Sequence, residues 1–337
     1  MFEKLKIVEL AMYLPLPYTG AFFASFGANV VKIEHPEGDP LKKLDSNIYQ
    51  TLNKKKHIKY IDIKDERNKT LLIDIVKDAD ILLNGFKPTF LKKYNLDYEA
   101  INRINPSLIY ISLYAYEKNT PLENIAGHDL NFVSLSGIMG SSKAGLKPFN
   151  FQMADMVGAL WSIIGSLYML EKRRETGMGG KLDLSLFRSC LTFFPFFYFS
   201  DVRGEIQDGI LYGDFACYNI YKCKDNKYIA VGSLEAKFFK RLLNLLKINF
   251  DESKLYLKKE QRHLKNLLKE KFITQTRDYW IDFFKNEDLC ITPILEKDET
   301  IKFLSRWFGE NSLENFLLFF GGLLNYFEIE NSILMLH

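Results

Sequence analysis

Residues 5–34 read LKIVELAMYLPLPYTGAFFASFGANVVKIE, and this stretch decides the fold class. Lys6 to Leu10 has the short, apolar, β-branched character of a buried strand. A helical segment from Pro17 to Phe26 follows, and Gly27 stands where a helix ends in left-handed backbone. Asn29 to Glu34 reads as a second buried strand. A strand, a helix and a strand in this order predict a parallel β-α-β unit.

The same alternation continues along the first half of the chain. Strands are expected at residues 58–63, 81–83 and 109–113, with helices at 71–77 and 91–94, the second ending at Asn95. The best-defined helix runs from about Asp155 to Thr176, with Asp155 as its N-cap and Gly177 as its stop. This pattern predicts an α/β fold with a large Rossmann-like parallel sheet. Its ligand crevice is expected at the carboxyl ends of the strands.

The sequence changes character after residue 190. Strands are expected at residues 218–221 and 228–231, around a turn at 224–226, which is typical of a small α+β domain. We therefore predict a large domain at residues 1–190, a smaller α+β domain at 205–296, and a separate C-terminal segment at 297–337.

Composition narrows the class of protein. The formal net charge is +3, and basic residues are scattered, which argues against a nucleic-acid partner. Four cysteines lack the spacing of a metal site and predict free thiols in a cytoplasmic setting. The chain enters its first strand almost at once, so no signal peptide is expected. No apolar run is expected to reach the ~18 residues of a membrane span, so we predict no membrane partner.

Common catalytic motifs are missing from the sequence. It has no Walker loop, no GxGxxG after a strand, no HExxH and no GxSxG. We therefore expect no metal site and neither a metal nor a redox cofactor. An acid–base enzyme, an enzyme with a carboxylate nucleophile, or a binding protein remains.

Two titratable residues have both a chemical and a plain structural interpretation. His128, in the polar stretch AGHDLN, is either an ordinary loop histidine or a group that exchanges protons near neutral pH. Asp155 is either a simple N-cap or a carboxylate that the helix N-terminus holds ionised for chemistry. The spacing of the two residues does not decide between these interpretations.

Several ordered motifs together carry a resemblance to a known family. They are LPLPY (14–18), FGANVVKIE (26–34), ADILLNGFKP (79–88), GHDLNF (127–132), LSG (135–137), ADM (154–156), ETGMG (175–179), VGSLE (231–235) and DLCITP (288–293). In this order they resemble the class III CoA-transferase (CaiB/BaiF) family, and its α-methylacyl-CoA racemase branch most closely. The resemblance covers most of residues 5–296, so the segment 297–337 is expected to be divergent.

The resemblance implies an isomerase of lipid metabolism that inverts C2 of 2-methyl-branched acyl-CoA thioesters. His128 and Asp155 would exchange protons on opposite faces of an enolate, and Glu235 would orient His128. One alternative is a class III CoA-transferase in which Asp155 is the nucleophile. Another is a catalytically inactive paralogue that binds acyl-CoA.

The resemblance also implies contacts to coenzyme A, which belongs to the substrate and is no separate cofactor. The large domain would bind it through Lys87, Lys93, His35 and Phe86. A lysine holds a phosphate as a point charge, without the two-pronged geometry of arginine. The plain alternative for each lysine is a solvated side chain.

The family further implies a homodimer, interlocked where the C-terminal segment returns to the large domain. The aromatic run Phe193 to Phe199 is expected in the core, and the alternative is the lining of an acyl tunnel.

Overall fold

The computed structural model describes residues 2–140, 146–196 and 209–308, which divide into two compact units at Pro195. The first unit is built on a six-stranded parallel sheet, in the order β3-β2-β1-β4-β5-β6. Its strands are β1 (Lys6–Leu10), β2 (Asn29–Glu34), β3 (His57–Tyr60), β4 (Ile81–Asn84), β5 (Ile109–Tyr114) and β6 (Gly180–Ser185). The predicted parallel α/β sheet is confirmed.

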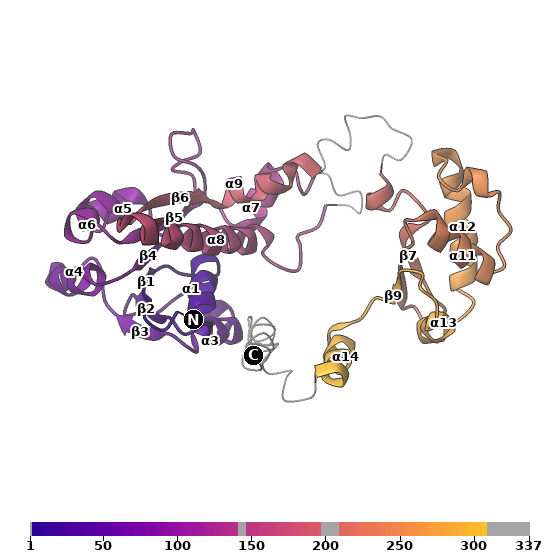
Figure 1. The fold of residues 1–337 in the computed structure, drawn as a ribbon, viewed down its shortest axis with the longest axis horizontal. Helices are drawn as coiled ribbons and strands as arrows, with labels where there is room; N and C mark the ends of the chain where they lie inside the picture. The colour runs from indigo at the N-terminus through magenta and orange to yellow at the C-terminus, as the bar shows by residue number, and fades with distance from the viewer. Residues whose placement is uncertain (1, 141–145, 197–208, 309–337) are drawn as a thin grey trace. The chain divides into compact units, whose positions relative to one another are not determined.

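Helices cover both faces of this sheet (Figure 1). Apolar residues of α1 (Pro15–Ser25) and α8 (Met153–Thr176) share one core with Ile7, Val30 and Ile109. Residues of α4 (Lys69–Lys77), α5 (Pro88–Lys93) and α6 (Tyr98–Ile104) form the other core with Val8 and Leu82. The remaining helices are α2 (Leu41–Leu44), α3 (Ser46–Asn53), α7 (Asp129–Leu135) and α9 (Leu186–Cys190).

Strands β2 and β3 follow on one side of β1, and the chain then crosses back to place β4, β5 and β6 on the other side. The order 3-2-1-4-5-6 is that of doubly wound folds, in which the loops after the two central strands part and leave a crevice. The fold therefore places its ligand crevice at the ends of β1 and β4.

Some elements differ from the prediction. Strand β6 was not predicted, because Lys181 and Asp183 interrupt its apolar character, and it lies at the edge of the sheet beside β5. Helix α8 begins at Met153, so Asp155 lies inside the first turn and Gln152 is the N-cap. Gly177 ends α8 in left-handed backbone, as predicted.

Helix α8 is also long and apolar enough to cross a membrane, by length and composition alone. This contradicts the expectation that no apolar stretch reaches that length. The face of α8 that carries Gly158, Ile163 and Met169 is buried in the first unit, where the helix contacts α1, β5 and β6. These contacts are those of a core helix in an α/β domain.

The second unit holds a three-stranded antiparallel sheet in the order β7-β8-β9. Its strands are β7 (Tyr218–Lys222), β8 (Tyr228–Gly232) and β9 (Ile291–Pro293), and its helices are α11 (Ala236–Leu245), α12 (Gln261–Phe272), α13 (Arg277–Phe284) and α14 (Lys297–Phe308). The predicted small α+β architecture is thereby confirmed, while the exact domain boundaries stay a prediction.

The aromatic run Phe193–Phe199 lies partly outside the described residues. Within them, Phe194 and Phe196 are exposed rather than buried in the core. Neither lines the cavity described below.

Candidate active site

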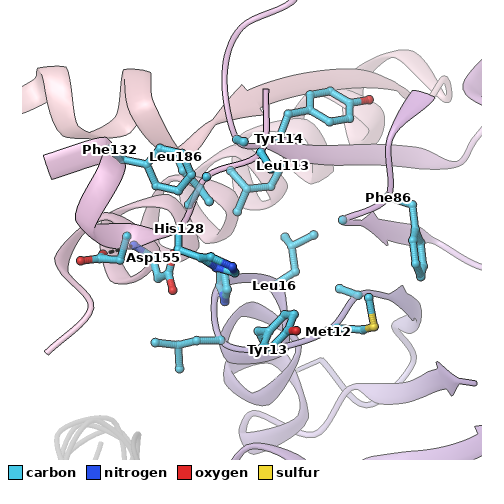
Figure 2. Close-up of a pocket in the computed structure, with 18 of the residues that line it drawn as sticks. Met12, Tyr13, Leu16, Phe86, Leu113, Tyr114, His128, Phe132, Asp155 and Leu186 are labelled. Carbon is cyan, nitrogen blue, oxygen red and sulfur yellow. Dashed lines mark hydrogen bonds between the residues drawn. The ribbon is translucent and has the colours of Figure 1, made fainter. Parts of the chain in front are cut away.

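A cavity of about 670 Å³ opens at the carboxyl ends of β1, β4 and β5 in the first unit. Its walls come from the loop after β1, the segment after β4, the segment after β5 and the start of α8 (Figure 2). Most of the lining side chains are apolar, including Met12, Leu16, Phe86, Leu113, Phe132 and Leu186. A few polar side chains lie among these apolar ones, which is typical of a ligand site.

His128 lines this cavity immediately before α7. Its backbone N–H donates to Asn131 Oδ1 at 3.0 Å, which fixes the start of the helix. Its imidazole lies edge-on to the ring of Tyr13, with ring centroids 6.1 Å apart. The exposed side chain lines the cavity and contacts the ring of Tyr13.

Asp155 lines the same cavity from the first turn of α8 (Figure 2). Burial raises the pKa of its carboxyl to about 7, and the neighbouring charge of Asp129 adds to this shift. The prediction that the helix N-terminus holds this carboxylate ionised is therefore wrong. The group gains and loses a proton near neutral pH, as a general acid–base catalyst requires.

Asp129 explains why the helix N-terminus does not stabilise the charge of Asp155. Its Oδ1 accepts the backbone N–H groups of Ala154 at 2.6 Å and of Asp155 at 3.2 Å. The first free N–H groups of α8 are thus already paired with another carboxylate. Sequence reasoning missed this role of Asp129, although the residue belongs to the GHDLNF motif beside His128.

Two of the predicted coenzyme A contacts, Phe86 and Lys87, line the cavity. Buried Asn84, the last residue of β4, pairs with the backbone of Phe86: its Oδ1 accepts the N–H at 2.9 Å and its Nδ2 donates to the carbonyl at 3.2 Å. The exposed Lys87 donates to the carbonyl of Asn124 at 3.3 Å. Lys118, which was not predicted, also lines the cavity and pairs with Asp183 at 2.9 Å.

The other two predicted contacts, Lys93 and His35, are not among the residues that line the cavity. Lys93 Nζ lies 5.5 Å from the ring centre of Tyr94. The half-exposed imidazole of His35 faces Asp62 with its Nε2 at 3.9 Å. Their contact with coenzyme A stays a prediction.

Glu235 belongs to the second unit, where it directly precedes α11. Its backbone carbonyl accepts the N–H groups of Phe238 and Phe239 at 3.0 and 3.1 Å and so begins the helix. Its orienting role toward His128 stays a prediction.

Among the described ranges, no group of three or more His, Cys, Asp or Glu residues gathers in a way that would hold a metal ion. The chemistry that the cavity itself offers is proton transfer between His128, Asp155 and a bound molecule.

Comparison with known proteins shows which family the sequence matches. The sequence profile described as CoA-transferase family III matches residues 2–311, which takes the match beyond Glu296 and through α14. A CaiB/baiF CoA-transferase family protein of Caenorhabditis elegans is 30% identical, over 88% of this chain and 86% of that protein. Human alpha-methylacyl-CoA racemase is 27% identical, over 89% of this chain and 79% of the enzyme.

Similarity also extends to a transferase and to a solved structure. Cinnamoyl-CoA:phenyllactate CoA-transferase of Clostridium sporogenes is 26% identical, over 86% of this chain and 77% of the enzyme. The crystal structure of a CAIB/BAIF family protein from Brucella suis superimposes with a TM-score of 0.78 at 26% identity, over 89% of this chain and 85% of that one.

Proposed function

Because the chain belongs to CoA-transferase family III, we propose that it inverts C2 of 2-methyl-branched acyl-CoA thioesters. One observation carries the proposal: the imidazole of His128 and the carboxyl group of Asp155, whose pKa burial raises to about 7, line the same cavity. The apolar walls around them suit a branched acyl chain. The similarity to human alpha-methylacyl-CoA racemase supports the same reaction.

The proposed reaction requires a proton acceptor and a proton donor on opposite sides of the α-carbon. One of the two residues removes the α-proton, and the electron pair moves onto the thioester oxygen as an enolate. The other returns a proton to the opposite face, so the configuration is inverted and no atom is gained or lost. The oxidation state of the substrate does not change, so the proposed reaction needs no redox cofactor.

CoA transfer between a thioester and a free carboxylic acid is the second candidate. In that reaction Asp155 attacks the thioester carbonyl, CoA leaves as the thiolate, and a mixed anhydride remains on the aspartate. The similarity to cinnamoyl-CoA:phenyllactate CoA-transferase, at nearly the same identity as the racemase, supports this candidate. The presence of His128 beside Asp155 favours racemisation, because the attack by a carboxylate needs no second proton-transfer group.

Deuterium exchange separates the two candidates. A racemase incorporates deuterium at C2 in heavy water with no acceptor acid present, and it converts each pure epimer into a mixture. A transferase gives no exchange without an acceptor and instead leaves a labelled acyl group on Asp155. A chain that binds acyl-CoA and does neither would be the inactive paralogue, and both enzyme proposals would then fail.

His128→Ala and Asp155→Asn test the two residues separately. For a racemase, His128→Ala lowers the rate of inversion by ~10²–10⁴-fold, while Asp155 still exchanges the proton on its own face of one epimer. Asp155→Asn abolishes turnover in either reaction. His57→Ala, an exposed histidine on β3, is the control and leaves both rates unchanged. Equal, small losses of exchange and inversion in His128→Ala would contradict the proposed role of this residue.

We also propose that the protein is a homodimer. One face of α8 exposes the large apolar side chains Leu160, Trp161, Ile164, Leu167 and Tyr168. A row of this size along one helix is typical of an interaction surface.

A further inference from the structure

Five charged residues gather between the sheet and α1, away from the solvent. They are Glu9, Lys32, Glu34, Asp39 and Lys56, and we call them the buried charge network. Glu9 and Lys32 are neighbours on paired strands and are fully buried, with Glu9 Oε1 and Lys32 Nζ 3.1 Å apart. Lys32 Nζ also contacts Asp39 Oδ2 at 2.8 Å, and Lys56 Nζ contacts Glu9 Oε2 at 2.8 Å.

Filling the space between the sheet and α1 does not require charged residues. Removing charges from water has a high free-energy cost, and apolar side chains of similar volume often replace a buried ion pair without loss of stability. Burial works against the charge on Lys32, but Glu9, Asp39 and Glu34 together hold its pKa above the ordinary value. Lys32 therefore stays charged in the interior, and its ammonium group can also donate a hydrogen bond to a backbone carbonyl.

The backbone that leads from β1 into α1 is hydrogen-bonded to three residues of the network, Lys32, Lys56 and Asp39. Lys32 Nζ donates to the carbonyl of Ala11 at 3.1 Å, and Lys56 Nζ donates to the carbonyl of Pro17 at 2.8 Å. Asp39 Oδ1 accepts the backbone N–H of Tyr13 at 3.2 Å. The network thus holds the loop at Ala11 and Tyr13, and the first turn of α1 at Pro17.

The same loop forms one wall of the cavity and contacts His128. Tyr13 lies in left-handed backbone, with φ of 64°, a conformation that a residue with a large side chain adopts only when its surroundings impose it. In this conformation its ring stands edge-on to the imidazole of His128, at an interplanar angle of 80° (Figure 2).

Gly20 on α1 brings the helix against the network. A Cβ atom at this position would overlap Glu9 Oε2 and crowd Lys56 Cε. The glycine therefore lets α1 approach the sheet closely enough for its first turn to accept the bond from Lys56.

We propose that the buried charge network is a positioning device: it fixes the backbone of Tyr13 and thereby the orientation of His128 in the cavity. The network residues are not among those that line the cavity, so we assign them a positioning role rather than a catalytic one. The consequence for activity rests on the proposed function, whereas the consequence for the imidazole does not.

The test compares the full-length chain with Asp39→Asn, which removes the partner of Lys32 at almost constant volume. Its first readout is the Cε1–H proton resonance of His128, one of only five histidines, assigned by its loss in His128→Ala. We expect Asp39→Asn to move this resonance in the direction seen in Tyr13→Ala, and Tyr13→Phe, which keeps the ring, to leave it in place. If Asp39→Asn does not fold, Lys56→Met takes its place.

The second readout is α-proton exchange in heavy water. We expect Asp39→Asn to lower the exchange rate at saturating substrate by roughly tenfold or more, with a smaller change in KM, because a misplaced catalytic group costs up to ~10²-fold. Leu82→Ala is the control: it destabilises the opposite core of the same sheet and should move neither readout.

The outcomes separate the two proposals. An unchanged His128 resonance in the network variant, or an equal change in Leu82→Ala, overturns the positioning proposal. If the wild-type chain exchanges no α-proton, the proposed reaction fails, while the resonance still decides whether the network positions His128.

Discussion

Asp155 contributes to the pH dependence of the protein's stability. Its folded-state pKa of about 7 lies above the ordinary aspartate value, so between about pH 4 and pH 7 the folded chain binds more protons than the unfolded one. The free energy of unfolding therefore falls as the pH rises through this window. Asp155→Asn removes the penalty, so its gain in melting temperature over the wild type should be larger at pH 8 than at pH 5.

The expected gain at pH 8 is on the order of 1–3 kcal/mol, which follows from about 1.4 kcal/mol per pKa unit with a discount for partial exposure. Asp78→Asn, at an exposed position after α4, is the control and should shift the melting temperature equally at both pH values. A gain for Asp155→Asn that is the same at pH 5 and pH 8 would contradict the raised pKa.

Sequence reasoning found the residues of the site more readily than their properties. His128 and Asp155 do line one cavity, as the resemblance implies. The ionisation of Asp155 was predicted wrongly, because the carboxylate that occupies the N-terminus of α8 comes from Asp129, which is 26 residues away in the sequence. Only the folded chain shows that competition. The same holds for Tyr13, whose contact with His128 no local pattern predicts.

At the scale of single elements, Glu299 links α14 to the rest of the second unit. Its carboxylate accepts Arg277 Nη1 at 2.7 Å and Lys227 Nζ at 2.6 Å. Arg277, almost fully buried, holds the pKa of Glu299 well below its ordinary value, with Lys227 contributing next. The contribution to stability is therefore fully present at neutral pH and is lost progressively as the pH falls below the ordinary glutamate pKa.

Glu299→Gln should loosen α14, because the neutral amide cannot pair with both cations. We expect faster amide hydrogen exchange across residues 297–308, measured by mass spectrometry, with little change in α12. Asp298→Asn, the exposed neighbour in the same first turn, serves as the control for the helix dipole. Equal acceleration in both variants would show that the bonds of Glu299 do not anchor the helix.

The elements differ in how well their sequence predicts them. Strands β1 and β2 were predicted to the residue, because β-branched apolar residues recur along both, although each also carries a buried charged residue, Glu9 in β1 and Lys32 in β2. Strand β6 was missed because it lies at the edge of the sheet and alternates Lys181 and Asp183 with apolar residues. A local sequence pattern predicts a strand through its buried apolar side chains. An edge strand has fewer of these, so it is the hardest strand to predict.

At the scale of the whole molecule, the apolar face of α8 makes the oligomeric state a testable property. We expect sedimentation velocity to show a particle of twice the mass of one chain. Ile164→Lys places a charge in the centre of the exposed row and should shift the protein toward the monomer. Leu71→Lys, at an exposed apolar position on α4, should leave the dimer intact. A wild-type monomer would refute the proposal.

The two-unit architecture was predictable from sequence, whereas the order of the strands was not. Alternating strands and helices predict a parallel sheet, but many strand orders satisfy the same alternation. The reversal between β1 and β4, which opens the cavity, depends on which strands pair across the sheet.

The pairing of Glu9 with Lys32 has a consequence for how this sequence changes over generations. A substitution of either residue alone removes one partner of a buried charge, so that Lys32 keeps Asp39 or Glu9 keeps Lys56, and breaking a buried pair in this way is destabilising. A substitution at one of the two positions is therefore unfavourable until the other position has also changed. The two positions are expected to covary among relatives of this chain, and a lineage that lost the lysine should have lost the glutamate with it.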